Sequence, residues 1–159
     1  MQTIISADEA RSLDGNRRGD ASDLISVAMS RDILVVDDNE RHLDILTSIL
    51  ASVGHDVEAC SSGVEALQRL ERRRYDAVLL DMVMPEVNGM VVNDQMRLTK
   101  LNVRTPVIAC TANVLIARSQ LADKEGVVAI IGKPIEAAAL VMAIARLPLP
   151  ERRRPSLGG

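Results

Sequence analysis

Five short apolar runs alternate with helix-like segments between residues 33 and 146, and this alternation constrains the fold more than any other feature of the chain. The first run, Ile33-Leu34-Val35-Val36, is continuous rather than alternating, which is typical of a strand buried on both faces. Apolar residues between the runs recur at spacings of three and four, as on one face of a helix. Because connections between parallel strands are right-handed, the pattern predicts an α/β fold with a doubly wound parallel sheet between helices. The other expected strands are residues 56–59, 76–80, 106–109 and 127–131.

Turn and capping residues place the helices. Asn39 can cap the first helix, and Ser62 can cap a second that turns Val64, Leu67 and Leu70 inward and ends in a solvated arginine run at 72–74. The remaining helices are expected after a Pro85/Gly89 loop, over residues 113–123 and over residues 136–146. We expect a folded domain at 31–147, a disordered N-terminal arm at 1–30 and a flexible Arg- and Pro-containing tail at 148–159.

Composition excludes several classes of function. The chain has 159 residues and a formal charge of −3, and Tyr75 is its only aromatic residue, so neither a basic field nor a stacking platform for nucleic acid is present. Cys60 and Cys110 are too few for a disulfide framework. No apolar run is long enough to cross a membrane. We therefore expect a soluble cytoplasmic protein that binds neither DNA nor membranes.

Polar residues follow four of the five expected strands. Asp37 and Asp38 follow the first, Asp81 the third, Thr111 the fourth, and Lys133 the fifth. Ligands of such sheets bind beyond the carboxyl ends of the strands, and these residues would share one rim if the strand order is 2-1-3-4-5. An Asp-Asp pair alone could be a solvated turn, but the whole set in order indicates a site.

The residue types at this rim suit phosphoryl chemistry. Three neighbouring carboxylates need a counter-charge, and Mg²⁺ takes oxygen ligands of this kind. Lys133 and Thr111 can hold phosphoryl oxygens. A carboxylate is a workable nucleophile toward phosphorus, and Asp81 stands alone at its strand end before the Pro85/Gly89 loop.

With these features the chain resembles the receiver (response-regulator, REC/CheY-like) domain of two-component phosphorelay signalling in bacteria. The resemblance covers about residues 31–147 and implies a flavodoxin-like (βα)5 fold of five parallel strands in the order 2-1-3-4-5. The motifs that carry it are Val35-Val36-Asp37-Asp38-Asn39, Leu80-Asp81-Met82-Val83-Met84-Pro85 with Gly89, residues 106–113, and Lys133-Pro134-Ile135.

The resemblance also implies roles for the site residues. Asp81 would be the phosphoacceptor, and Mg²⁺ would be held by Asp38, by Asp37 mostly through water, by Asp81, and by the backbone carbonyl of Val83. The donor would be a phosphohistidine on a histidine kinase or a histidine phosphotransfer protein. The protein would then be a switch rather than an enzyme, limited to self-catalysed phosphoryl transfer and slow autodephosphorylation.

The resemblance further implies how the switch would work. Thr111 and the amide of Ala112 would bind phosphoryl oxygens, Lys133 would pair with the phosphoryl group, and the Lys133-Pro134 bond would be cis. Similar domains carry an aromatic switch residue where this chain has Ile130, so a smaller surface change is expected. The apolar side chain of Val83 cannot orient a water, which predicts slow loss of the phosphoryl group.

Output is expected through protein contacts. The run Val114-Leu115-Ile116 cannot face inward as a whole. The face formed by the helix at 113–123, the strand at 127–131 and the helix at 136–146 is therefore expected to bind an output protein or form a dimer, and the alternative is an unusual arrangement in which the run is buried. A stand-alone receiver that signals or shuttles phosphoryl groups fits best.

Two other classes stay open. One is a receiver-fold binding module that acts without phosphorylation, including a cyclic di-nucleotide effector through Arg152–Arg154. The other is a hydrolase, for which the short loops leave little room. His42 and His55 lack metal-ligand spacing and are expected in solvated or capping roles.

Overall fold

The computed structural model describes residues 3–4 and 30–150, and its elements form one parallel sheet with helices on both faces. The sheet order is β1-β6-β5-β4-β2-β3, and every neighbouring pair is parallel. The five strands from β2 to β6 confirm the predicted order 2-1-3-4-5. A sixth strand, β1, was not predicted. The strands are β1 (Thr3–Ile4), β2 (Asp32–Val36), β3 (Asp56–Cys60), β4 (Ala77–Asp81), β5 (Val107–Thr111) and β6 (Val127–Gly132).

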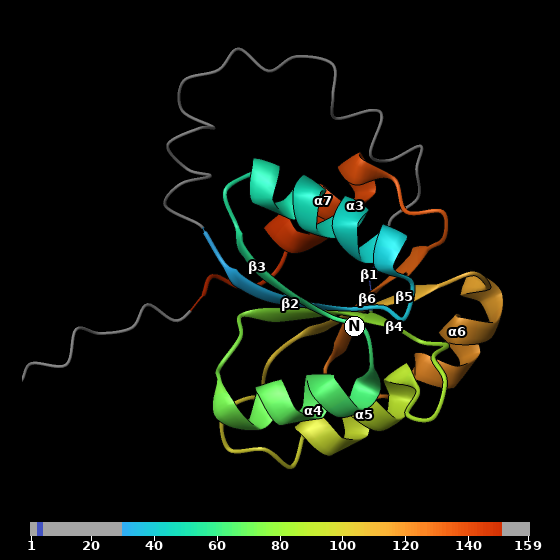
Figure 1. The fold of residues 1–159 in the computed structure, drawn as a ribbon. Coiled ribbons are helices and arrows are strands. Elements are labelled where there is room, and N and C mark those ends of the chain that lie inside the picture. The colour runs from blue at the N-terminus through green and yellow to red at the C-terminus, as the bar shows by residue number, and fades with distance from the viewer. Residues whose placement is uncertain (1–2, 5–29, 151–159) are drawn as a thin grey trace, which may run out of the picture.

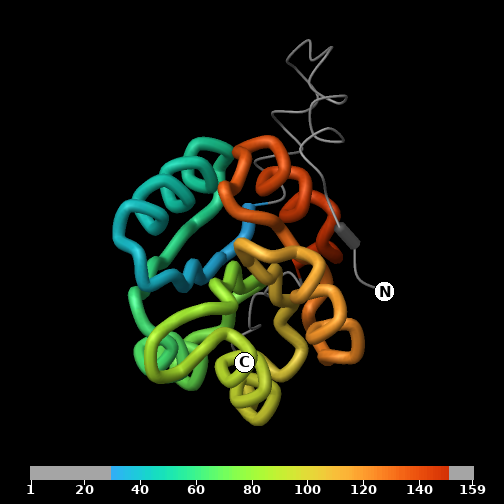
Figure 2. Tube along the Cα trace, turned by 90° about the vertical axis from the view of Figure 1, so that its right-hand side faces the viewer, coloured from blue at the N-terminus to red at the C-terminus, as the bar shows by residue number. Residues whose placement is uncertain are grey.

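Within residues 30–150, five helices flank the sheet in two layers. Helices α3 (Glu40–Ser52) and α7 (Ala137–Ala145) cover one face (Figure 1). The other face carries α4 (Gly63–Arg72), α5 (Gly89–Met96) and α6 (Val114–Leu121). The view turned by 90° shows the same helices as a ring around the strands (Figure 2). This doubly wound arrangement leaves the ends of the strands as the accessible edges of the sheet.

Side-chain caps explain where the helices begin. Asn39 accepts hydrogen bonds from the amides of Arg41 and His42, and Ser62 accepts one from Glu65, as predicted for both caps. Asn113 does the same for α6. Helix α3 ends where Gly54 takes a φ of +93°, a conformation that favours glycine.

The core is split by the sheet into two apolar clusters. The residues of β2, β4 and β5 are almost all buried, which confirms that their continuous apolar runs are strands covered on both faces. In α5 and α7 the apolar residues Val92, Met96, Leu140 and Ile144 are buried. In α4 the prediction was partly wrong. Val64 is exposed, and the small Ala66 packs inward in its place, because the helix starts at Gly63 and its buried face runs through Gly63, Ala66 and Leu70.

The predicted solvated arginine run at the end of α4 is partly an ion-pair centre. Arg73 lies against Glu58 and within 3.3 Å of Asp32, and its guanidinium stands over the ring of Tyr75. Arg69 also pairs with Glu58, at 3.1 Å. Sequence spacing could not show these contacts, because the carboxylates lie on neighbouring strands.

A buried arginine ties the two ends of the domain together. Arg31 is 1% exposed, and its guanidinium donates to the carbonyls of Leu147 and Pro148 at 3.0 and 2.6 Å.

Most of the predicted arm at 1–30 and residues 151–159 of the predicted tail lie outside the described residues, so both domain boundaries stay predictions. Among residues 3–4 and 30–150 no helix is long and apolar enough to cross a membrane.

Candidate functional site

The parallel register brings four strand ends to one edge of the sheet. Val36, the last residue of β2, lies beside Leu80, so Asp37 and Asp81 leave adjacent strands at the same level. Asp81 is paired with Cys110 of β5, and Thr111 with Gly132 of β6. The polar residues predicted to share one rim therefore do so.

Three carboxylates form the centre of this edge. One oxygen each from Asp37, Asp38 and Asp81 lie within 4.8 Å of one another. Asp37 and Asp81 are buried, whereas Asp38 is exposed. Like charges this close repel one another in a partly desolvated setting, so the cluster favours a cation or a proton.

Lys133 is the ammonium that faces the cluster. Its Nζ lies 3.1 Å from Asp81 Oδ2 and 3.2 Å from Asp37 Oδ2. Burial alone would lower the pKa of Lys133, but the two carboxylates outweigh it and raise that pKa, so the ammonium stays charged. The Lys133-Pro134 peptide bond is cis, as the resemblance implied.

The surroundings of Asp81 act on its pKa in opposite directions. Burial raises the pKa of Asp81, and neighbouring Asp37 adds to the effect. The amide of Val83, which donates to Asp81 Oδ1 at 3.1 Å, and the ammonium of Lys133 oppose it without cancelling it. Ionised Asp81 therefore carries a cost of burial that the Val83 amide and Lys133 do not fully offset.

A glycine lets the following loop pack against this strand end. The amide of Gly89 donates to the carbonyl of Met82 at 3.3 Å. A Cβ at Gly89 would collide with the backbone carbonyl of Asp81. Only glycine allows this approach, so the loop that the sequence marked with Pro85 and Gly89 is held close beside Asp81.

The donor set fits a hard divalent cation. The three clustered groups offer carboxylate oxygens only, and the exposure of Asp38 leaves room for the waters that Mg²⁺ retains. Asp37, Asp38 and Asp81 could hold such an ion. The part assigned to the carbonyl of Val83 stays a prediction.

Thr111 and Ile130 lie near the cluster in different settings. The Thr111 hydroxyl accepts a hydrogen bond from the amide of Asn113 at 3.1 Å, and the side chain is 6% exposed. Ala112, which follows it, is exposed. Ile130 is fully buried in β6. The phosphoryl-binding and switch roles expected of these three residues stay predictions.

One side chain at the site was missed. His42 was expected in a solvated or capping role and is exposed, but its Nδ1 also lies 3.3 Å from Asp37 Oδ2, a contact that was not predicted. The available signal was its place in the first turn of a helix that starts directly after Asp37 and Asp38, at the same strand end.

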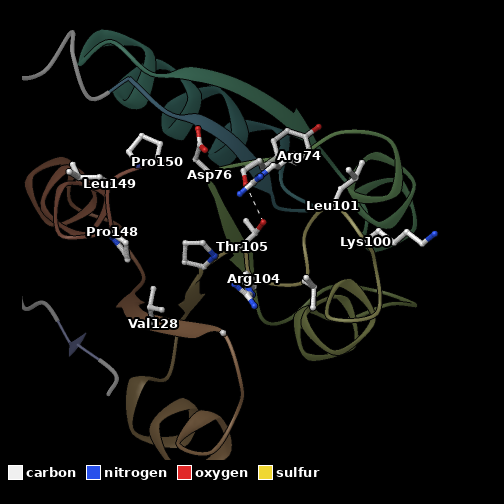
Figure 3. A pocket seen from close by; sticks show the side chains of 14 residues that line it. Arg74, Asp76, Lys100, Leu101, Arg104, Thr105, Val128, Pro148, Leu149 and Pro150 are labelled. Carbon is white, nitrogen blue, oxygen red and sulfur yellow. Dashed lines mark hydrogen bonds between the residues drawn. The ribbon is translucent and has the colours of Figure 1, made fainter. Parts of the chain in front are cut away.

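The opposite ends of the strands enclose a different kind of space. A cavity of about 450 Å³ lies there, between the starts of β4, β5 and β6 and residues 148–150 (Figure 3). Arg74, Lys100 and Arg104 line it together with Asp76. Arg152–Arg154, on which the cyclic di-nucleotide hypothesis depends, lie outside the described residues, so that hypothesis is untested.

Known proteins share this fold and sequence pattern. The family described as the response regulator receiver domain matches residues 33–145. The signal transduction histidine-protein kinase BarA of Escherichia coli K12 is 30% identical over 104 residues, 65% of this chain and 11% of that protein. The sensory/regulatory protein RpfC of Xanthomonas campestris is 30% identical over 123 residues, 76% of this chain and 17% of its own length. The chain thus spans only a small part of these relatives.

Solved structures agree. The receiver domain of sensor histidine kinase PA1611 from Pseudomonas aeruginosa PAO1, which has a magnesium ion in its active site cleft, superposes with a TM-score of 0.68 at 30% identity, covering 74% of this chain and 97% of that one. A CheY-like receiver domain protein from Methanospirillum hungatei gives a TM-score of 0.66 at 27% identity, covering 73% and 91%. Together with the acidic edge and the strand order, these matches show that the chain belongs to the response regulator receiver family.

Proposed function

We propose that this chain is a phosphoacceptor signalling module that takes a phosphoryl group on Asp81 from the phosphohistidine of a histidine kinase or a histidine phosphotransfer protein. The observation that carries the proposal is the convergence of Asp37, Asp38 and Asp81 with Lys133 at one sheet edge. A receiver of this kind is a switch or a phosphoryl shuttle rather than an enzyme with a separate substrate.

The chemistry follows from where the charges lie. A carboxylate oxygen of Asp81 attacks the phosphorus in line, the bond between phosphorus and the histidine nitrogen breaks, and its electron pair stays on the imidazole. The product is an acyl phosphate on Asp81. The ammonium of Lys133, 3.1 Å from Asp81, offsets the negative charge that gathers on the transferring group. A bound Mg²⁺ would supply further charge compensation at the same oxygens.

Output would follow from a rearrangement on the neighbouring strands. The hydroxyl of Thr111, which now accepts a hydrogen bond from the amide of Asn113, would turn toward a phosphoryl group on Asp81. The face of α6, β6 and α7 would carry the change to an output protein or a second copy. Leu115 and Ile116 support this assignment, because they are 76% and 53% exposed on α6. With Ile130 in place of a ring, the rearrangement is expected to be small.

Amide NMR spectra of the full chain with Mg²⁺, recorded with and without beryllofluoride as a phosphoryl mimic, test the proposal. We expect large shifts at residues 37–38, 81–84 and 111–113 and smaller ones across α6 and β6. The Asp81→Asn variant is the matched control and should not respond to beryllofluoride. Equal responses of the native and Asp81→Asn chains would contradict the proposal.

The loop beyond Asp81 bears on how long the phosphoryl group persists. Val83 is 76% exposed two residues after Asp81, and its side chain has no polar atom to orient an attacking water. We expect Val83→Asn to speed phosphate release from the phosphorylated chain about tenfold, which is the rate effect of one hydrogen bond worth about 1.4 kcal/mol in the transition state. Val83→Leu is the control and should leave the rate unchanged. If Val83→Asn released phosphate no faster than the native chain, the result would contradict the role of Val83 in slowing phosphate release.

A further inference from the structure

The outer edge of β6 is covered by the chain's own N-terminal residues. Thr3 pairs with Ala129 and Ile4 with Ile130, in parallel, so β1 takes the position beyond the last strand of the receiver sheet (Figure 1). An uncovered edge strand presents a row of unpaired N–H and C=O groups to any other extended chain. In this chain those peptide groups lie on β6, and the exposed Leu115 and Ile116 lie on α6, which is part of the same proposed output face.

The backbone directions show which groups β1 covers. The amide of Lys133 donates to the carbonyl of Thr111 at 2.8 Å, so it points toward β5. Successive residues of a strand direct their peptide groups to opposite edges, so the amide of Ile131 also points toward β5 and that of Ile130 points toward β1. In a parallel pair such a residue bonds to the residues flanking its partner. Because Ile4 is the partner of Ile130, the peptide groups of Thr3 face β6.

Composition explains why this edge needs a cover. Residues 127–132 of β6 carry no charge and no proline. The strand at the other edge of the sheet, β3, carries Asp56 and Glu58, and charged side chains discourage strand addition. An apolar, uncharged edge without such protection would be open to pairing with another chain.

The connection is long enough for β1 to reach β6 of the same chain. Four strand spacings of about 4.8 Å, roughly 19 Å, separate β1 from β2 across the sheet. Residues 5–29 join them, and a chain of that length can span roughly 80 Å when extended. Pairing within one chain does not depend on protein concentration, whereas pairing between two copies does.

We propose that Thr3 and Ile4 form a detachable guard strand, which covers the β6 edge in the isolated chain and must leave before another strand can pair there. The described part of this strand pairs through two residues, and so short a pairing can be displaced by a partner of moderate affinity. A regulatory role for the guard strand rests on the output role proposed above for the face of α6, β6 and α7. The guard strand would keep that face from pairing with a second copy.

Amide hydrogen exchange in two full-chain variants tests the guard strand. Thr3→Pro removes a peptide N–H that faces β6, whereas Thr3→Val, the matched control, keeps it. We expect the Ile130 amide to exchange about tenfold faster in Thr3→Pro than in Thr3→Val, because local protection depends on the pairing. The amide of Ile131 should exchange equally in both variants, since it points toward β5. Equal exchange of Ile130 in the two variants would overturn the proposal.

Two further measurements test whether the same chain or a second copy supplies the strand, and whether the strand prevents self-association. Protection of Ile130 in the native chain should not change on dilution, and loss of protection on dilution would mean that a second copy supplies the strand and would overturn the intramolecular guard. In sedimentation velocity, Thr3→Pro should self-associate at a lower concentration than Thr3→Val, and equal behaviour would contradict a guarding role. Phosphorylation of Asp81 should be the same in both variants, so its absence would count against the proposed function and not against the guard strand.

Discussion

The two ends of the sheet bury polar side chains in opposite ways. Where the strands begin, all hydrogen-bonding groups of the buried Asn102 side chain are satisfied. Its NH2 group donates to the carbonyls of Leu70 and Arg73, and its oxygen accepts from the amide of Tyr75 and the hydroxyl of Thr105. Where the strands end, three carboxylates cluster, and only two of them, Asp37 and Asp81, contact the ammonium of Lys133. A satisfied polar group stabilises a fold, whereas excess like charge costs stability and is retained for chemistry. The difference separates structural from functional polar groups within one sheet.

The sharpest way to break this comparison is to remove the satisfied amide. Asn102→Ala would leave the buried amide of Tyr75 and two carbonyls without partners, and we expect a loss of about 3 kcal/mol in the free energy of unfolding. Chemical denaturation measures it. Asn88→Ala, which removes one exposed helix-capping bond, is the control and should cost about 1 kcal/mol. A loss from Asn102→Ala no larger than that of the control would mean that the amide network is not structural.

A divalent cation should supply positive charge to the three-carboxylate cluster and so stabilise the fold. At ten times its dissociation constant, Mg²⁺ is expected to add about 1.4 kcal/mol to the free energy of unfolding, seen as a higher thermal midpoint. Asp38→Asn should abolish most of the gain. Asp44→Asn, an exposed acid on α3 outside the three-carboxylate cluster, should keep it. A gain that survives Asp38→Asn would place the cation elsewhere.

A smaller effect is expected from removing the charge of Asp81, whose pKa is raised mainly by burial and further by Asp37. Because the folded chain raises the pKa of Asp81, the ionised carboxylate costs stability at pH values above that pKa, and the cost fades as the pH falls through it. Without Mg²⁺, Asp81→Asn should therefore stabilise the chain by about 1 kcal/mol at pH 7 and by less near pH 4. Denaturation at the two pH values decides this. Destabilisation at pH 7 would show that Asp81 is held as a satisfied structural group.

The sequence predicted the acidic edge well because simple rules govern it. Continuous apolar runs marked the strands, polar residues followed each run, and parallel strands end at the same rim, so Asp37, Asp81 and Lys133 could be brought together without coordinates. The order of the strands came from the family resemblance. Local caps at Asn39 and Ser62 were equally readable, because a cap and its helix are neighbours in the chain.

What the sequence did not predict depends on contacts between distant parts of the chain. Arg73 meets Glu58 and Asp32 only after β2, β3 and β4 have paired. Strand β1 has two residues, too few for any periodic signal, and its partner β6 lies at the other end of the sequence. His42 was missed because its contact with Asp37 depends on the direction of a side chain at a helix start.

Intact-mass measurement of the full chain after incubation with phosphoramidate tests the central assignment most directly. With Mg²⁺ present, we predict the addition of one phosphoryl group, which peptide mapping should locate on Asp81. The addition should not occur when the metal is chelated before the incubation. It should also be absent in Asp81→Asn and retained in Asp44→Asn. Addition of a phosphoryl group to the Asp81→Asn chain at the native rate, or at another residue of the native chain, would contradict the assignment of this edge as a phosphoacceptor site.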